Sequence, residues 1–343
     1  MATILPSQSS SLSKTSNEED HKDEEIEKIE RIYKSYKEVI STLSKEKGWI
    51  SPHLCQYQGF WFDPTYNLAG VMFIQQHFKP RPTDVLLISS PKSGTTWLKA
   101  IAFAIMKRTS YNSMSVVHPL LTTNPHDCVP FLEILLRTPP IADVEDLPSP
   151  RLFSSHIPYT LLSESIQNSG CRIVYVCRNP KDVFTSMWHF TTKLKTNNLP
   201  CSSLSLEEAF DMFCEGISSY GPFWDHVLGY WKASLACPES VLFLNYEDMR
   251  RDTPIHVKKL AEFLGQPFSL EEESKGIVQG IVELCSFENL SNLEVNKNGT
   301  LHYGIKGDVF FRKGQIGDWK NHLTAQMTER LDQITKEKLG GLF

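Results

Sequence analysis

The chain has 343 residues, of which 41% are hydrophobic, and a formal net charge of −5 at pH 7. This length allows a sizeable core in one large α/β domain or two smaller ones. The acidic balance argues against a general nucleic-acid binder, which would normally show a basic face or tail. No stretch reaches the ~18 consecutive apolar residues of a membrane-spanning helix, because Lys99 and Lys107 flank the apolar run Ala100–Met106. We therefore expect a soluble protein with no nucleic acid and no membrane among its partners.

The amino-terminal residues 1–22 are expected to form a disordered tail. Met1–Ser16 is rich in serine and free of acids, as some organelle transit peptides are. Acidic residues begin at Glu18, however, and no arginine precedes Arg31. The eight cysteines include no CxxC pair and follow no apolar signal sequence, so we expect reduced thiols. A cytoplasmic protein is the favoured interpretation, and organelle targeting is the alternative.

Hydrophobic periodicity then indicates the secondary structure in chain order. Apolar residues recur every three or four positions over Glu24–Leu43, which predicts a helix packed on the main domain. The following segment, Lys47–Asp63, is aromatic and irregular. Beyond it, three apolar runs are typical of buried strands: Val85–Ser89, Arg172–Cys177 and Val241–Leu244.

Helical patterns follow the first two of these runs, at Trp97–Lys107 and near Asp182–Thr192. Strands that alternate with helices predict an α/β fold with a central, mostly parallel sheet flanked by helices. In such folds ligands bind at the carboxyl ends of the strands. No linker divides the region from about Pro80 to the end, so we expect a single domain.

The loop after the first predicted strand has the sequence PKSGTTW, residues 91–97. Its backbone N–H groups can converge on an anion at a helix N-terminus, and Gly94 allows a close approach. Lys92 adds a mobile positive charge suited to a phosphate or sulfuryl group. Three hydroxyl side chains add hydrogen-bond donors: Ser93, Thr95 and Thr96. The loop is not a Walker A motif, because its lysine precedes the only glycine, and alone it would also fit a capped helix start.

PKSGTTW closely resembles the 5′-phosphosulfate loop of the cytosolic sulfotransferases, and two further motifs follow in that family's order. YVCRNPKDVFTSMWHF (175–190) resembles the family's 3′-phosphate segment, and FFRKGQIGDWK (310–320) resembles its closing nucleotide loop. LLTTNPHD (120–127) and LCSFENLSNLEVNK (284–297) are similar to the plant branch of the family. The likeness covers roughly residues 47–342. It implies one sulfotransferase domain, assigned to residues 23–343, with a P-loop-like phosphosulfate-binding loop.

The resemblance implies that 3′-phosphoadenosine 5′-phosphosulfate (PAPS) is the co-substrate. PAPS has two anionic ends, and for each end the sequence offers one basic loop that contains a glycine. The family's nucleotide-binding positions match Lys92, Ser93, Gly94, Thr95, Thr96, Trp97, Arg178, Ser186, Tyr246, Ser286, Phe287, Arg312, Lys313 and Gly314. Among these, Trp97 and Tyr246 would contact adenine. From the residues alone, Arg178 also fits a structural ion pair and Ser186 an ordinary helix position.

A hydroxyl acceptor must lose its proton as it attacks sulfur, and histidine titrates in the right range to accept that proton. His156 follows a strand-like run and precedes a proline-marked turn, a place that exposes a side chain at a sheet's edge. It also matches the family's catalytic histidine. Many animal members carry a lysine two residues earlier, where this chain has Ser154. Helical or terminal patterns explain other histidines as surface or core residues, among them His189, His226 and His322.

By resemblance, the reaction is in-line sulfuryl transfer with His156 as general base. Lys92 would stabilise charge on the leaving oxygen, and donors aimed at the sulfuryl oxygens would stabilise the transition state. Ser186 would hold Lys92 away until the acceptor is present. The chain has no His/Cys cluster with metal-ligand spacing, so we expect no metal.

The acceptor is expected to be a small hydroxylated plant metabolite, such as a flavonol, hydroxyjasmonate, brassinosteroid or desulfoglucosinolate. Aromatic residues that fit a flat or apolar acceptor, but also an ordinary core, are Tyr57, Phe60, Trp61, Phe62, Phe131 and Tyr159. The stretch Lys320–Glu329 resembles the dimerisation motif of animal members, with Ala325 in place of a valine. The smaller side chain buries less apolar area, so we expect a monomer or weak homodimer. Two alternatives stay open: a kinase-like phosphotransferase and a catalytically silent PAPS-binding protein.

Overall fold

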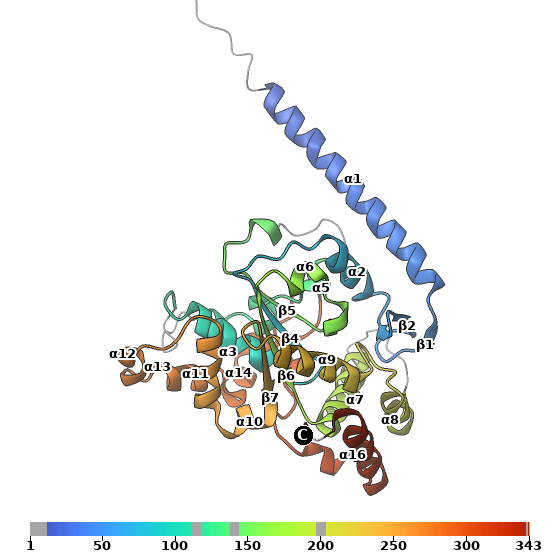
Figure 1. Cartoon of the computed structure of the whole chain (residues 1–343), viewed down its shortest axis with the longest axis vertical. Coiled ribbons are helices and arrows are strands. Elements are labelled where there is room, and N and C mark those ends of the chain that lie inside the picture. The colour runs from blue at the N-terminus through green and yellow to red at the C-terminus, as the bar shows by residue number, and fades with distance from the viewer. Residues whose placement is uncertain (1–11, 112–117, 138–143, 197–203, 341, 343) are drawn as a thin grey trace, which may run out of the picture.

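The computed structural model describes residues 12–111, 118–137, 144–196, 204–340 and 342, with side chains of 12–23 and 25 excepted. A four-stranded parallel sheet with strand order β5-β4-β6-β7 occupies the centre (Figure 1). Its strands are β4 (Val85–Ser89), β5 (Leu152–Ser155), β6 (Arg172–Cys177) and β7 (Val241–Asn245). A small antiparallel sheet contains β1 (Lys45–Lys47), β2 (His53–Tyr57) and β3 (Phe60–Phe62).

Helices cover both faces of the parallel sheet, and the amino-terminal part of α1 extends away from the rest of the chain (Figure 1). Tyr33 and Tyr36, in the carboxyl-terminal half of α1, are buried in the core, as the predicted packing of this helix requires. The α-helices are α1 (Leu12–Thr42), α2 (Leu68–His77), α3 (Thr95–Lys107), α4 (Pro125–Cys128), α5 (Leu132–Leu135), α6 (Glu164–Gln167), α7 (Pro180–Thr196), α8 (Leu206–Cys214), α9 (Phe223–Ala236), α10 (Tyr246–Arg251), α11 (Thr253–Phe263), α12 (Leu270–Ser274), α13 (Ile277–Leu284), α14 (Phe287–Asn292), α15 (Glu294–Lys297) and α16 (Ala325–Leu339). Short 3₁₀ helices are η1 (Pro119–Leu121), η2 (Val144–Asp146), η3 (Tyr159–Leu161), η4 (Gly307–Phe310) and η5 (Asp318–Asn321).

The hydrophobic core lies in two layers, one on each face of the parallel sheet. Successive strand residues point to opposite faces, and here both sets are apolar. Leu86 and Tyr175 pack with residues of α7 and α9, whereas Leu87 and Val174 pack with residues of α3, α11 and α13. Burial on both faces is the reason that these strands read as continuous apolar runs in the sequence.

The register of the parallel sheet brings the carboxyl ends of its strands to one edge. Ser89 pairs with Val176, and the last residues of β6 and β7 pair with each other. Four predicted site elements follow these ends directly: the loop 90–94 after β4, His156 after β5, Arg178 after β6 and Tyr246 after β7. The fold therefore brings residues that are far apart in the sequence to a single edge.

The structure confirms the predicted α/β fold, the three predicted strands and the helices after the first two. It differs at Lys47–Asp63, which was expected to be irregular but contains β2 and β3 of an antiparallel hairpin. Gln58 and Gly59 form the turn with positive φ angles of 49° and 85°. The helix predicted over Glu24–Leu43 is part of α1, which begins at Leu12. The division into a tail, 1–22, and a domain, 23–343, stays a prediction, since residues 1–11 lie outside the described ranges.

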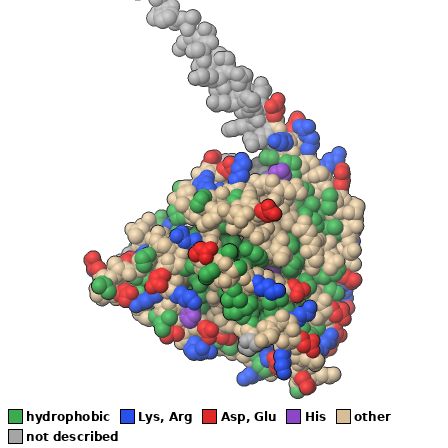
Figure 2. Space-filling model, viewed as in Figure 1, with side chains coloured by type: hydrophobic (Ala, Val, Ile, Leu, Met, Phe, Trp, Pro, Cys, Tyr) green, Lys and Arg blue, Asp and Glu red, His purple; other side chains and the backbone are tan. Residues whose placement is uncertain are grey.

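The visible surface carries acidic and basic side chains interspersed, without a field of one sign (Figure 2). Within the described ranges, the cysteines are free, and Cys201 lies outside those ranges. None of the helices described has the length and apolar character that a membrane crossing requires.

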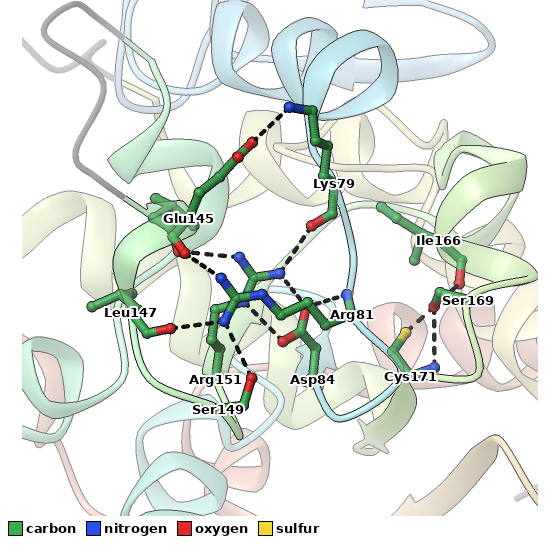
Figure 3. A network of polar contacts seen from close by, with 11 residues as sticks. Lys79, Arg81, Asp84, Glu145, Leu147, Ser149, Arg151, Ile166, Ser169 and Cys171 are labelled. Atoms are coloured by element: carbon green, nitrogen blue, oxygen red, sulfur yellow. Dashed lines mark hydrogen bonds and ion pairs between the residues drawn. The ribbon is translucent and has the colours of Figure 1, made fainter.

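A buried ion pair joins the amino ends of β4 and β5 (Figure 3). Arg151 Nε donates to Asp84 Oδ1 at 2.8 Å, and the backbone N–H of Arg81 donates to Asp84 Oδ2 at 2.8 Å. The side chains of Arg151 and Asp84 are 1% and 0% exposed. Because a charge buried this deeply depends on its partner, the pair sets the alignment of the two strands at the edge opposite the predicted site.

We expect Asp84→Asn to lower the free energy of unfolding by about 3 kcal/mol or more, because it leaves the Arg151 guanidinium buried without a counter-charge. Urea unfolding of the full chain measures the loss. The matched control is Glu273→Gln, which removes the carboxylate from a partly exposed pair with Lys258 and should cost less than about 1 kcal/mol. Equal small losses in both variants would contradict the role given to the buried pair.

Candidate active site

A cavity of about 340 Å³ lies at the carboxyl edge of the parallel sheet. Most of the site residues predicted from the sequence line it: Lys92, Gly94, Thr95, Thr96, Trp97, His156, Arg178, Ser186, Tyr246, Phe287, Arg312, Lys313 and Gly314. Ser93 and Ser286 are not among the lining residues. Ser93 Oγ is buried without a hydrogen-bond partner among the described residues. Ser286 Oγ accepts the N–H of Asn289 at the start of α14.

The loop between β4 and α3 is held close to the end of β7. Gly94 has a φ of 109°, and a Cβ atom at this position would lie 2.6 Å from the Tyr246 ring. The hydroxyls of Thr95 and Ser89 are 2.6 Å apart and tie the loop to the end of β4. The 13-residue helix α3 begins at Thr95, so the loop amides lie at a helix N-terminus, where anions bind favourably.

Lys92 extends from this loop toward two aromatic rings. Its Nζ lies 3.9 Å from the centroid of Phe190 and 5.8 Å from that of Phe310. Burial, together with the nearby charges of Arg312, Arg178 and Lys193, lowers the pKa of Lys92 to about 7. No carboxylate pairs with Lys92 among the described residues, so an incoming anion would meet a cation that has no counter-charge. Nor do the described contacts include a Lys92–Ser186 hydrogen bond, and the expected restraint by Ser186 stays a prediction.

Arg178 lies at the end of β6 and is 7% exposed. Its Nη2 donates to the backbone oxygen of Gln315 at 2.7 Å, and its guanidinium lies 4.5 Å from the centroid of the Tyr246 ring. The Tyr246 ring makes an edge contact with Trp97 at a centroid distance of 5.5 Å. The predicted adenine contacts and the predicted phosphate-binding arginine therefore form one continuous wall.

The closing loop 312–318 adds two more cations beside Arg178. Arg312 and Lys313 both pair with Asp318, the lysine at 2.7 Å. The side chain of Asp182, on α7, accepts the backbone N–H of Gly317 at 2.8 Å and holds the loop against this helix. The Nε atoms of Arg178 and Arg312 have no hydrogen-bond partner in the part of the chain that the structure describes. These two donors fit an anionic ligand such as a 3′-phosphate.

The same loop packs tightly against α14. Gly314 has a φ of 61°, and a Cβ atom there would lie 2.4 Å from the Phe287 ring. Glycine is therefore needed at this position both for its backbone conformation and for the close approach.

His156 is oriented by a hydrogen bond to the end of β4. Its Nδ1 lies 2.6 Å from the backbone oxygen of Ser89, and because a carbonyl only accepts, Nδ1 must carry the proton. Nε2 is then the unprotonated nitrogen. Burial lowers the pKa of His156 to about 3, so the ring stays neutral at physiological pH. The structure thus gives His156 the tautomer that a general base at Nε2 requires.

Three residues that sequence reasoning did not select support His156. Glu133 Oε1 accepts the backbone N–H of His156 at 2.8 Å and the hydroxyl of Tyr220 at 3.0 Å. His226 Nε2 donates to the backbone oxygen of His156 at 2.8 Å. Among these three residues, Glu133 had a signal in the sequence that could have marked it as functional: it is a single acid inside the apolar run 131–136. The helical pattern around His226 indicates a surface or core position, and the residue is buried, in contact with the predicted base.

Among the aromatic residues expected to contact an acceptor, Phe131 lines the cavity. Phe60, Trp61 and Phe62 are buried in the core, and Tyr57 and Tyr159 pack against it. No group of three or more His, Cys, Asp or Glu side chains that could hold a metal ion occurs within the described ranges.

Comparisons with known proteins agree with this geometry. The sulfotransferase domain family matches residues 82–343. Cytosolic sulfotransferase 15 of Arabidopsis thaliana is 45% identical over 307 residues, which cover 89% of this chain and 85% of the relative.

Two solved structures extend the match. An Arabidopsis thaliana protein described as a steroid sulphotransferase candidate is 41% identical, with a TM-score of 0.70 over 88% of this chain and 92% of its own. Mouse sulfotransferase SULT7A1, solved in complex with PAP, is 26% identical, with a TM-score of 0.62 over 83% of this chain and 95% of its own. PAP is 3′,5′-bisphosphoadenosine, the nucleotide that PAPS leaves after transfer. These matches favour the sulfotransferase interpretation over a kinase-like phosphotransferase.

We expect the affinity for PAP to fall as the pH rises above 7, because Lys92 then loses its proton in the free protein whereas a bound anion favours the charged form. One titrating lysine gives a loss of about tenfold per pH unit once the pH exceeds its pKa. Calorimetric titration with PAP at pH 7, 8 and 9 measures the slope.

Lys92→Met is the control for this pH dependence. Its affinity should be weaker at pH 7 and nearly constant from pH 7 to 9. A wild-type affinity that does not change over this range would contradict the lowered pKa of Lys92.

Proposed function

Given that the chain belongs to the cytosolic sulfotransferase family and is a PAPS-dependent sulfotransferase, we propose that it sulfates a hydroxyl of a small, largely apolar plant metabolite with His156 as the general base. Flavonols, hydroxyjasmonates and brassinosteroids are the compound classes that we favour. The observation that carries the proposal is the orientation of His156: an unprotonated Nε2 in the same cavity as the Lys92 ammonium.

The donor fits the charged part of the cavity. We assign the 3′-phosphate to Arg178, Arg312 and Lys313, and the phosphosulfate end to the loop that contains Lys92 and the N-terminus of α3. When bound, PAPS supplies an activated sulfuryl group on a phosphate leaving group. The free Nε atoms of Arg178 and Arg312 and the unpaired Lys92 support this assignment, since each gains a hydrogen-bond or charge partner on binding.

His156 and Lys92 have complementary roles in the proposed chemistry. His156 accepts the acceptor's hydroxyl proton at Nε2, while the Ser89 carbonyl steadies the proton already on Nδ1. Lys92 stabilises the negative charge that develops on the leaving phosphate oxygen. The low pKa of His156 makes the base available at every physiological pH, although a weak base must transfer its acquired proton onward quickly. Glu133 is positioned to stabilise the transient positive charge through the backbone of His156.

We assign the acceptor to the mainly apolar part of the cavity around His156, where the rings of Phe131 and Tyr220 contact the imidazole. Its walls include Trp49, Ile50, Phe131, Ile134, Met187 and Tyr220. Two buried oxygens interrupt this wall, Asp63 Oδ2 and Asn67 Oδ1, and neither has a hydrogen-bond partner among the described residues. An acceptor with an apolar body and a second hydroxyl would satisfy them. Polyhydroxylated flavonols and steroids have this character.

We expect His156→Gln to lower kcat at least about 100-fold, because the amide cannot take the proton. PAP affinity should stay within about twofold, since His156 is not assigned to the nucleotide. Transfer of labelled sulfuryl from PAPS and calorimetric PAP binding measure the two quantities. Retained turnover would overturn His156 as the base. Loss of both turnover and PAP binding would indicate a structural defect instead.

The acceptor proposal is tested with pairs of flavonols or steroids that differ by one hydroxyl distant from the sulfated position. We expect kcat/KM to be about tenfold or more higher for the member with two hydroxyls, because buried polar groups left unpaired weaken binding of the other.

In Asn67→Leu this preference should shrink, while Leu235→Ala, a change at an exposed position, should keep it. Equal kcat/KM values within every pair would reject the second-hydroxyl requirement. Hydroxyjasmonate and desulfoglucosinolate complete the acceptor panel.

A further inference from the structure

Lys99 is a fully buried lysine on α3, one turn beyond the phosphosulfate loop. Its side chain is 0% exposed, although lysine is almost never fully buried unless it is paired. Among the described residues it forms no ion pair with a carboxylate. Its Nζ instead lies 2.9 Å from His126 Nδ1 and 3.3 Å from the centroid of the Phe131 ring. A lysine in this environment needs an explanation beyond packing.

His126 continues this contact to the cavity. The residue is 2% exposed, and its Nε2 lies 2.9 Å from Thr96 Oγ1. Asn124 Oδ1 accepts the backbone N–H of His126 at 2.9 Å and fixes the start of α4. Both His126 and Thr96 line the cavity. Lys99, His126 and Thr96 therefore form a chain of hydrogen bonds that runs from the core to the site.

The donors and acceptors set the direction of this chain. A lysine ammonium can only donate, so His126 Nδ1 accepts and its Nε2 carries the proton. Nε2–H then donates to Thr96 Oγ1, and the Thr96 hydroxyl keeps its own proton free to donate into the cavity. In the reverse direction, a neutral Lys99 amine would accept the proton on His126 Nδ1. Thr96 would then donate to His126 Nε2 and present only lone pairs to the cavity. An anion in the cavity favours the first direction.

Burial favours the neutral forms, since it lowers the pKa of Lys99 and of His126 well below their usual values. Glu133 and Asp127 act in the opposite sense on Lys99, and Lys92 and His156 further lower the pKa of His126. A neutral Lys99 amine can still donate an N–H to His126 Nδ1, so the first direction is open to both protonation states of Lys99, and an anion in the cavity favours it.

We propose that Lys99 and His126 are positioning residues that act through Thr96, holding its hydroxyl as a hydrogen-bond donor to the phosphosulfate end of the donor nucleotide. This inference rests on the proposed function and deepens it. Sequence reasoning selected Thr96 but neither of the two residues behind it. The hydrogen-bond chain links the buried Lys99 amine to the anionic end of the cavity through His126 and Thr96 rather than by direct contact.

A double-mutant cycle tests the proposal in the full-length protein, with calorimetric binding of PAP and of adenosine 3′-monophosphate, which lacks the 5′ anion. We expect Lys99→Met and Thr96→Val each to weaken PAP binding about tenfold or more, as loss of a charge-assisted hydrogen bond does. The double variant should bind PAP within about twofold of Thr96→Val alone, because Lys99 acts through that hydroxyl. Affinity for the 3′-monophosphate should be unchanged in all three.

His126 supplies a test by conservative rescue if Lys99→Met does not fold. Glutamine can accept from Lys99 and donate to Thr96, so His126→Gln should keep most of the PAP affinity, whereas His126→Leu should lose about as much as Thr96→Val. Lys107→Met, the same change at an exposed position of α3, is the control and should leave binding unaltered.

Additive losses in the double variant, or equal weakening of the 3′-monophosphate, would overturn the proposal and leave Lys99 a structural role. Equal losses in His126→Gln and His126→Leu would also overturn it. Failure of the wild-type protein to bind PAP at all would instead overturn the nucleotide site itself, so the two failures are distinguishable.

Discussion

The parallel pairing of β4 with β5 and β6, and of β6 with β7, is the constraint on which the site depends. Because all four strands run in the same direction, their carboxyl ends meet at one edge. Lys92, His156, Arg178 and Tyr246 each follow one of these ends within three residues. The buried Asp84–Arg151 pair aligns β4 and β5 at the opposite edge. The distance between Lys92, after β4, and His156, after β5, therefore depends on a contact far from the site.

The electrostatics of this edge favour a ligand with several negative charges. Seven lysine and arginine side chains line the cavity within the described ranges, and the closing loop provides only Asp318 for Arg312 and Lys313. Burial, followed by repulsion from nearby cations, lowers the pKa of Lys92 to about 7. A nucleotide with an anion at each end would offset this repulsion and give Lys92 a counter-charge. The fold therefore holds hydrogen-bond donors without partners and closely spaced positive charges, and both favour binding of PAPS.

Sequence patterns predicted the strands and the nucleotide loops well because each is a local feature. PKSGTTW, for instance, places a basic glycine-containing loop between an apolar run and a helix within a few residues. The hairpin at β2–β3 was missed because its turn uses Gln58–Gly59, without the usual Asn-Gly or Asp-Gly signal. Lys99 and His126 are 27 residues apart and meet only in the tertiary structure. In the sequence Lys99 only flanks the apolar run Ala100–Met106, whereas the helix buries it on the face that it shares with Thr95.

Calorimetric comparison of PAP with adenosine 5′-monophosphate tests the central claim most directly, since the two ligands differ in the 3′-phosphate assigned to Arg178, Arg312 and Lys313. With three cations near that group, we expect one molecule of PAP to bind per chain, about 100-fold or more tightly than the 5′-monophosphate. Equal affinities for the two nucleotides would show that the cations at the ends of β6 and in the closing loop do not form a 3′-phosphate site, and would contradict the account.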